Sequence, residues 1–215
     1  MMLAVALSAP FAGGEVLEYR LEWLGMEVGT LTLRTEDQGD CWLFIMDSST
    51  RGIGARLYPA KETLTSLVRK SDFQTLFFQK AGEKKKGATL EETLFDPETG
   101  EYYYKFFRDM NGPCVDTLSC IHFLRLPEAW NGPMPASYDR GKYYRLDIPK
   151  PVLETVRLGS RERRARRVTV RLAEEDRRPK KGRMTLWFSD DVRQLPLMLE
   201  FAIPLGTLKA RLICE

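Results

Sequence analysis

Apolar and polar residues alternate along nearly the whole chain, and this period of two predicts a protein built from β-strands. In residues 15–24 the apolar residues fall mostly on one face of an extended chain, and Gly25 then turns the chain back. The pattern ends near the C-terminus in three runs separated by a polar corner and by Gly206, which is typical of an antiparallel meander. The expected strands are 15–24, 28–33, 41–47, 62–70, 73–80, 89–95, 101–108, 142–148, 152–158, 166–172, 183–189, 195–203 and 207–214.

One segment, residues 116–126, breaks this rhythm and predicts a helix. Its apolar residues Leu118, Ile121 and Leu124 recur at spacings of three, Asp116 suits the N-cap position, and Pro127 ends the pattern. The segments expected to be irregular are 48–58, which could contain a short helical turn, 81–87, a hairpin loop, and 131–140, a loop rich in Gly and Pro.

Roughly twelve strands and one helix in a chain of 215 residues predict a single mainly β domain over residues 13–215. Antiparallel sheets with so many strands curl, split or close. We therefore expect a strongly curved antiparallel sheet or incomplete barrel with one short helix packed against it. No apolar run approaches the ~20 residues that a transmembrane helix needs.

Residues 1–12 are small and apolar and read as a truncated secretory signal segment. A cut would follow Ala12, although Pro10 fits the usual cleavage pattern poorly and no basic residue precedes the apolar run. On this reading the protein is exported to the periplasm or cell envelope. The alternative is a disordered, slightly apolar start of a cytoplasmic chain.

Four cysteines, at positions 41, 114, 120 and 214, contain no C-x-x-C pair, so a zinc ribbon or thioredoxin-type motif is not indicated. In an exported protein they could form two disulfides in any of three connectivities, with Cys114 and Cys120 close enough in sequence to pair across a loop. Four small buried hydrophobic residues are an equally good reading.

The charge is concentrated in one segment. Between Arg157 and Arg183, 12 Lys and Arg stand against four Asp and Glu, so this window nets +8 while the whole chain nets +3. If Val168, Val170 and Leu172 face inward, two basic clusters lie at the ends of a strand and form a basic rim that could bind anionic headgroups or lipopolysaccharide phosphates. The rim residues are Arg161, Arg163, Arg164, Arg166, Arg167, Arg177, Arg178, Lys180 and Lys181. The alternative is a solvated loop, and nucleic acid is not favoured because no aromatic residues are interleaved.

Candidate catalytic residues are few. His122 is the sole histidine, and Asp190 with Asp191 invites a carboxylate-pair reading, although neighbours in a strand point to opposite faces and the two residues suit an Asx turn. Asp116 and Ser119 lack a G-x-S-x-G elbow, and N-capping explains Asp116. No metal or cofactor is indicated, because no P-loop, G-x-G-x-x-G or metal-ligand spacing occurs.

The order of four short motifs resembles the bacterial envelope family catalogued as domain of unknown function 3108, whose activity is unassigned. The motifs lie at 19–33, 48–52, 116–125 and 187–206, and together they span nearly the whole chain. The residues that carry them are Trp23, Gly25, Gly29, Asp116, Ser119, Arg125, Trp187, Asp190, Asp191, Arg193 and Pro196. The resemblance implies an exported, mostly β protein without assigned catalytic residues. The basic stretch at 161–167 and the missing basic start depart from the family pattern.

Three functional hypotheses follow. The first is a non-enzymatic envelope protein that holds an apolar or lipid-like ligand, or a partner, in the curved sheet. The second is a carboxylate-dependent hydrolase of an envelope component that uses Asp190, Asp191 or Asp116. The third is an interaction module that docks an acidic partner through the basic rim. Convergence of the carboxylates and His122 in one cleft would favour the hydrolase.

Overall fold

Sixteen β-strands form one sheet in the part of the chain that the computed structural model describes, namely residues 9–57, 59–84, 87–110, 112–130, 135–139, 142–173, 183–203 and 206–214. The first eight are β1 (Glu15–Trp23), β2 (Met26–Gln38), β3 (Cys41–Thr50), β4 (Ala60–Arg69), β5 (Thr75–Lys84), β6 (Gly87–Asp96), β7 (Glu101–Tyr104) and β8 (Phe106–Asp109). The others are β9 (Cys114–Asp116), β10 (Ala136–Asp139), β11 (Lys142–Asp147), β12 (Val152–Leu158), β13 (Arg161–Ala173), β14 (Arg183–Ser189), β15 (Pro196–Ile203) and β16 (Gly206–Cys214). The helical elements are α1 (Gly52–Leu57), α2 (Thr117–Phe123) and the 3₁₀ helix η1 (Pro127–Trp130).

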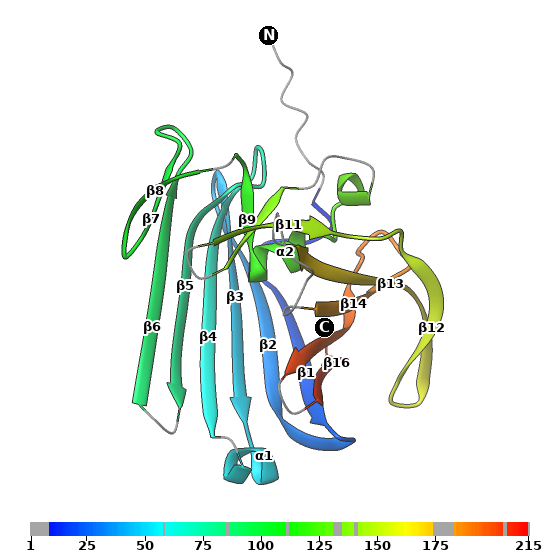
Figure 1. Ribbon diagram of the computed structural model, residues 1–215. Coiled ribbons are helices and arrows are strands. Elements are labelled where there is room, and N and C mark those ends of the chain that lie inside the picture. The colour runs from blue at the N-terminus through cyan, green and yellow to red at the C-terminus, as the bar shows by residue number, and fades with distance from the viewer. Residues whose placement is uncertain are drawn as a thin grey trace.

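The strand order runs β8-β7-β6-β5-β4-β3-β2-β1-β16-β15-β14-β13-β11-β10-β9, with β12 paired to the remaining part of β13. Neighbours are antiparallel except for β9 and β10, which are parallel. The first strand therefore lies beside the last one, and the two halves of the meander join there (Figure 1). None of the described helices is long and apolar enough to cross a membrane.

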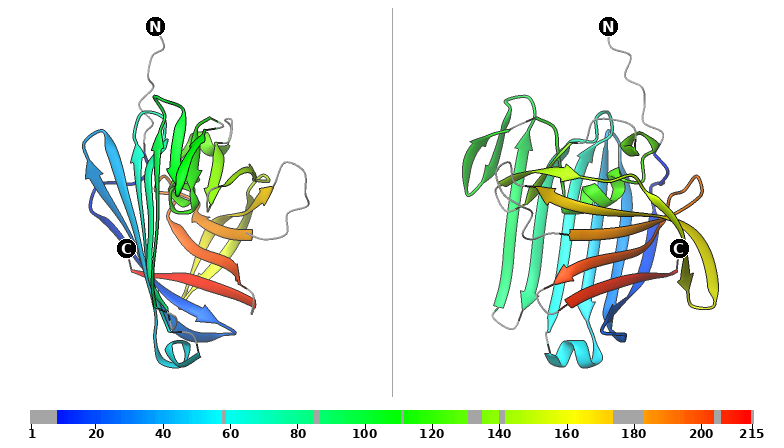
Figure 2. Two further views of the ribbon diagram at one scale, coloured as in Figure 1. Left: turned by 60° about the vertical axis from the view of Figure 1, so that its left-hand side comes forward. Right: turned by 45° about the vertical axis from the view of Figure 1, so that its right-hand side comes forward.

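The sheet curves until its two halves face each other, with α2 between them at one end (Figure 2). Shifts of register occur where an extra residue interrupts the ladder, for example between Leu21 and Glu22 and between Trp187 and Phe188. Such bulges increase the local twist and bend of a strand. The sheet does not close, because β8 and β9 end the strand order. The expected curved sheet or incomplete barrel is confirmed.

Helix α2 covers the core between the two halves. Leu118 and Ile121 are buried there with Phe44 of β3 and Leu64 of β4. Asp116 caps the helix by accepting hydrogen bonds from the amides of Leu118 (2.8 Å) and Ser119 (3.1 Å), and Ser119 completes a capping box. The expected N-cap is therefore confirmed.

The C-terminal end of the predicted helix was wrong. The helix ends at Phe123 and not at 126, because the chain tightens into turns at Leu124–Leu126 and then forms η1. The expected short helical turn within 48–58 is α1.

Two predicted loops were too long. The 81–87 loop is mostly strand, since β5 continues to Lys84 and β6 starts at Gly87. Within 131–140 the chain forms β10, which pairs with β9. Residues 81–84 continue the hairpin by pairing with residues 87–90, although their own sequence is polar. The short strand β10 depends on its pairing with β9 and β11.

The predicted strand 101–108 is a hairpin. Lys105 adopts a left-handed backbone conformation with φ of 64°, and Tyr104 then pairs with Phe106. A residue with positive φ reverses the chain locally, so the dense aromatic run is divided between β7 and β8.

The basic segment also differs from the prediction. Residues 161–167 are part of the long strand β13, and they pair with β12 on one side, while residues 165–171 pair with β14 on the other. Val168 and Val170 are buried and Arg171 is exposed, as the alternation predicted. The remaining members of the predicted rim, Arg177, Arg178, Lys180 and Lys181, lie outside the described residues.

Gly29 marks a close approach of two backbones. A Cβ at this position would lie 2.1 Å from the backbone oxygen of Ser49 in β3, and the adjacent bulge in the β1–β2 ladder begins at the pair of Leu21 and Gly29. Gly25 has a different requirement, because its φ is +79° and a Cβ there would meet nothing within 4 Å.

We expect Gly29→Ala to lower the free energy of unfolding by about 2–3 kcal/mol, because the methyl group forces apart two hydrogen-bonded strands. Gly25→Ala should cost only about 1 kcal/mol, from its backbone conformation. Urea denaturation of both variants measures the difference. Equal stability of Gly29→Ala and the wild type would contradict the close approach.

Candidate functional site

A fully buried arginine lies at the centre of the polar network that joins the two halves of the sheet. The Arg125 side chain, which follows α2, is 0% exposed and forms a bidentate ion pair with Glu15 at the start of β1. The Nη1–Oε2 distance is 2.6 Å and the Nη2–Oε1 distance is 2.9 Å. The Glu15 side chain is only 9% exposed. This parallel geometry is the strongest that an arginine and a carboxylate can form.

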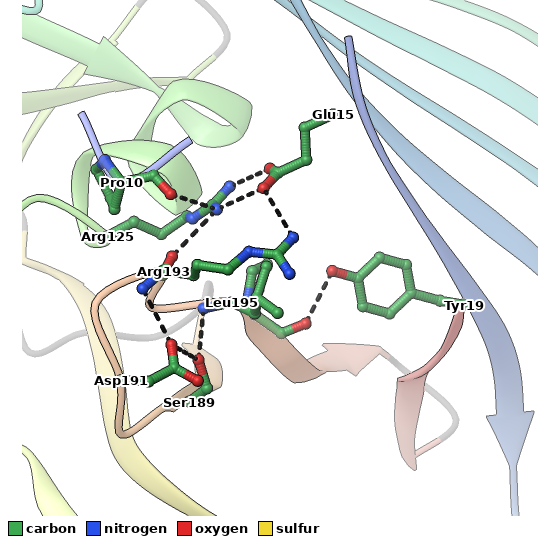
Figure 3. A network of polar contacts seen from close by, with 9 residues as sticks. Pro10, Glu15, Tyr19, Arg125, Ser189, Asp191, Arg193 and Leu195 are labelled. Atoms are coloured by element: carbon green, nitrogen blue, oxygen red, sulfur yellow. Dashed lines mark hydrogen bonds and ion pairs between the residues drawn. The ribbon is translucent and has the colours of Figure 1, made fainter. Parts of the chain in front are cut away.

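Arg125 also binds two backbone oxygens. Its Nη2 donates to the carbonyl of Arg193 at 3.2 Å and to that of Pro10 at 3.5 Å (Figure 3). The Arg193 side chain returns to Glu15, with an Nη2–Oε1 distance of 3.8 Å. One guanidinium thus joins the N-terminal segment, β1 and the turn between β14 and β15.

That turn is held by its own polar side chains. Asp191 accepts hydrogen bonds from the Ser189 hydroxyl (2.8 Å) and from the amide of Arg193 (3.0 Å), and the Ser189 hydroxyl accepts from the amide of Leu195 (2.8 Å). The Asx-turn interpretation of this corner is therefore confirmed. The Tyr19 hydroxyl of β1 donates to the carbonyl of Pro196 at 2.8 Å, which joins β1 to the residue that follows the turn (Figure 3). Burial raises the pKa of Tyr19 well above its ordinary value, so the phenol remains protonated.

An aromatic cluster lies beside Arg125. The His122 ring stacks on Phe44 with centroids 3.8 Å apart, and Phe11 packs edge-on against both rings and against Trp42. The Arg125 guanidinium carbon lies 5.0 Å from the Phe11 ring centroid, which is cation–π distance.

His122 is fully buried, and neither of its ring nitrogens has a hydrogen-bond partner among the residues that the structure describes. Burial, with a smaller contribution from the positive charge of Arg125, holds the pKa of His122 well below its ordinary value. The imidazole is therefore neutral and packs as an aromatic ring.

An open cleft of about 1280 Å³ adjoins this network. It lies among the N-terminal segment, η1, the start of β12 and the 191–194 turn. The lining residues are Ala9, Pro10, Phe11, Ala12, Glu15, Pro127, Trp130, Pro151, Leu153, Arg166, Asp191, Val192, Arg193 and Gln194. Within the wall, the Trp130 indole donates to the Gln194 side chain at 3.2 Å.

The candidate catalytic residues have separate environments. Asp116 is buried as a helix cap and also accepts hydrogen bonds from Ser66 and Thr75, while His122 is enclosed by aromatic rings. Asp190 forms ion pairs with arginines, and Asp191 is used in its turn. The structure does not bring the expected carboxylates and the histidine together. In the described residues, no group of three or more His, Cys, Asp or Glu could hold a metal ion.

Arginines of the predicted basic rim form ion pairs with two different carboxylates. Arg164 and Arg166 bind Asp190, with closest distances of 3.3 and 2.9 Å. Arg167 binds Glu154 at 3.0 Å, and Glu154 also accepts a hydrogen bond from the indole of Trp187.

The structure also bears on the two readings of the cysteines, as disulfides or as small buried residues. Cys120 is a free thiol inside the core, and burial raises its pKa to about 12. The suggested pairing of Cys114 with Cys120 therefore does not occur. Cys41 is also free, and the Cys114 sulfur accepts a hydrogen bond from Gln74. The side chain of Cys214 lies outside the described residues.

Several of the motif residues meet at this site, namely Arg125, Asp191, Arg193 and Pro196. Sequence reasoning missed Glu15, Phe11 and Gln194. Glu15 opens a strand and looks like an ordinary polar start, and nothing local links it to an arginine 110 residues away. Phe11 carried a weak signal, as the one aromatic residue in a segment of small side chains.

The comparisons with known proteins agree with this architecture. The sequence profile of the family described as "Protein of unknown function (DUF3108)" matches residues 18–213. A crystal structure described as a beta-barrel-like protein of domain of unknown function DUF1849 from Brucella abortus superposes with a TM-score of 0.59 over 92% of this chain and 94% of that one. The two sequences are 9% identical, so the likeness concerns the fold. No curated protein matches the chain.

Substitutions of Arg125 and Glu15 should have strongly non-additive effects on the free energy of unfolding, because the two side chains form one buried ion pair. We expect Glu15→Leu and Arg125→Met each to lower the free energy of unfolding by about 3–5 kcal/mol. Glu15→Leu leaves the buried guanidinium without a carboxylate, and Arg125→Met leaves Glu15, among the described residues, with only the 3.8 Å contact to Arg193. The double variant should lose clearly less than the sum of the two, because it leaves neither charge behind. Chemical denaturation of all four proteins measures this coupling.

The pair of Arg69 and Asp72 is the matched control, because it is also bidentate but its side chains are 32% and 43% exposed. Breaking it with Asp72→Ala should cost less than about 1 kcal/mol. Equal losses for the buried and the exposed pair would contradict the central role of Arg125.

His122 should make stability depend on pH. Because its folded-state pKa is lowered, the unfolded chain binds the proton first, and stability present above about pH 6.5 is lost as the pH falls, by up to about 1.4 kcal/mol per unit. His122→Phe should remove this loss between pH 7 and 5 and unfold no more easily than the wild type at pH 7.5. If the free energy of unfolding of the two proteins changed equally with pH across this range, the pKa of His122 would not be lowered by folding, and the prediction would be wrong.

Proposed function

The chain belongs to the family described as "Protein of unknown function (DUF3108)", and we propose that it is an exported, non-enzymatic envelope protein that holds an apolar or lipid-like ligand in the cleft beside Arg125. The observation that carries this proposal is the apolar wall of the cleft, which is open to solvent. Leu153 is 56% exposed and Val192 is 89% exposed, and both line the cleft with Trp130. Exposed apolar side chains gathered in one concave surface are typical of ligand sites.

The cleft is also charged in a way that suits an amphiphile. The guanidinium groups of Arg166 and Arg193 lie in its lining, and their side chains are 38% and 50% exposed. Asp190 pairs with Arg166 and Glu15 pairs with Arg193, and Glu15 and Asp191 also line the cleft, so the lining has no net charge. The exposed parts of the two guanidinium groups can still donate hydrogen bonds, so a ligand with an apolar body and one polar, hydrogen-bond-accepting end fits this arrangement.

The N-terminal segment bears directly on this site. Residues 9–12 form part of the lining, and Phe11 fills the space against Trp42 and His122. The expected cut after Ala12 would remove these residues and extend the cleft toward the aromatic cluster. Export and ligand binding would then be linked, since the site would reach full depth only after processing.

The hydrolase hypothesis has less support. Its carboxylates serve as a helix cap, an arginine partner and a turn acceptor, and none of these roles leaves a carboxylate directed with a second one at a common point. Support for binding is stronger than support for turnover, because the cleft combines apolar area with a few charges.

Leu153→Asp tests the cleft. It should weaken binding of the apolar probe 1-N-phenylnaphthylamine to the full chain by about tenfold or more, because it replaces about 1.5–3 kcal/mol of apolar contact with a carboxylate. Fluorescence titration gives the dissociation constant, and anilinonaphthalene sulfonate, tested in parallel, reports whether an acidic end improves affinity.

Val152→Asp is the matched control, since Val152 is 50% exposed on the same strand but does not line the cleft. It should leave the affinity for both probes unchanged. Absence of binding by the wild type, or equal effects of the two substitutions, would overturn the proposed function.

A further inference from the structure

Four arginines from three strands meet at a second, smaller hollow at the far end of the β12–β13 hairpin. Its volume is about 420 Å³, within the range of small-molecule sites of roughly 300–1,000 Å³. The lining residues are Arg20 of β1, Arg161 and Arg163 of β13, Arg211 of β16, the turn residues Gly159 and Ser160, and the apolar Leu158, Leu212 and Ile213. No carboxylate is among these lining residues.

The strand pairing forces two of these arginines together. Arg20 and Arg211 are directly opposite each other in the β1–β16 ladder, an arrangement in which like charges repel. Glu22 separates them by accepting from both, with Arg20 Nε at 3.1 Å and Arg211 Nε at 2.8 Å. One carboxylate therefore bridges two guanidinium groups. Arg20 Nε also lies 3.9 Å from Glu27 Oε2, so two carboxylates face these two arginines, and the further arginines of the hollow are Arg161 and Arg163.

Both contacts with Glu22 use Nε atoms, so the forked Nη ends of the two guanidinium groups are not consumed by this carboxylate. Arg211 Nη1 makes one long hydrogen bond of 3.4 Å, to the carbonyl of Arg157. The paired Nη donors of arginine match the oxygens of a phosphate or carboxylate group.

The hairpin supplies further charge. Arg161 is exposed and forms no ion pair within the described part of the chain, and Arg163, two residues along the same strand, points to the same side of β13. The tight turn at Gly159, where φ is 60°, precedes both arginines, and Gly159 and Ser160 line the hollow with them.

Apolar side chains complete the hollow. Leu212 is buried, Leu158 is partly buried, and Ile213 is 59% exposed. We propose that this hollow is an anion-binding site that takes a phosphate group through Arg20, Arg161, Arg163 and Arg211, with room for an apolar extension against Ile213.

Such a phosphate could be the headgroup of an anionic lipid or a free phosphate compound. The exposed Ile213 beside the arginines suits a headgroup at a membrane surface, where an apolar side chain meets the interface and arginines meet phosphates. The site is separate from the cleft at Arg125, so either site can exist without the other.

The test is Arg161→Ser with Arg163→Ser in the full chain. We expect its affinity for vesicles of phosphatidylglycerol mixed with phosphatidylcholine to fall about 25-fold, at roughly fivefold for each arginine. Cosedimentation measures vesicle binding, and titration calorimetry with inorganic phosphate measures the free anion. Unchanged thermal midpoints of the variant and the wild type show that both are folded.

The matched control is Arg171→Ser with Arg183→Ser, which removes the same charge from exposed positions that face each other on β13 and β14, outside the hollow. Loss of phosphate and vesicle binding only in the first double variant supports a headgroup site, and loss of phosphate binding alone supports a site for a soluble phosphate. Equal losses in both double variants, or no binding of either probe by the wild type, would overturn the proposal. Neither result depends on the naphthylamine probe, so failure here leaves the proposed function of the cleft intact.

Discussion

The bidentate pair of Arg125 and Glu15 is the interaction on which the arrangement of this molecule depends. A buried guanidinium is costly to desolvate, and good geometry with several acceptors is needed to offset that cost. Here both Nη atoms bind the carboxylate, and the carbonyls of Pro10 and Arg193 accept further bonds. The pair thereby fixes the end of α2 against the first strand and against the corner between β14 and β15. The curvature of the sheet brings these three elements close, and the ion pair holds them in one register.

The same residues shape the cleft. Glu15 and Arg193 belong both to the buried network and to the cleft lining, so the rigid and the accessible parts of the site share side chains. The Asp191 turn presents Val192 outward because its polar neighbours are committed to hydrogen bonds inside the turn. Under the proposed function the cleft would be preorganised, because these hydrogen bonds already fix part of its wall before a ligand enters.

Much of the fold followed from residue patterns, because alternation reports directly on which side of a strand is buried. The helix was visible for the same reason, with Asp116 as its cap and three apolar residues at its spacing. Strand ends were harder to predict. Residues 161–167 carry too many arginines to look like a strand, and they form one because β12 pairs with all of them and β14 pairs with residues 165–167 on the other side. The turn at Lys105 was not predicted, because the residue with positive φ there is not a glycine. The ion pair of Arg125 with Glu15 could not be predicted from local patterns, because the two residues are 110 positions apart and only the curvature of the open sheet brings them together.

The pairing of β1 with β16 has a consequence for how the protein is made. Tyr19 faces Leu212 and Trp23 faces Leu208, so the seam in the middle of the sheet joins segments that leave the ribosome at opposite times. The hairpins from β1 to β8 can form as they emerge, but their outer edge at β1 stays unpaired until the last strand arrives. Long-range pairing of this kind is slow and leaves an open strand edge exposed in the meantime. A nascent chain would therefore need protection at β1 for as long as β16 is missing.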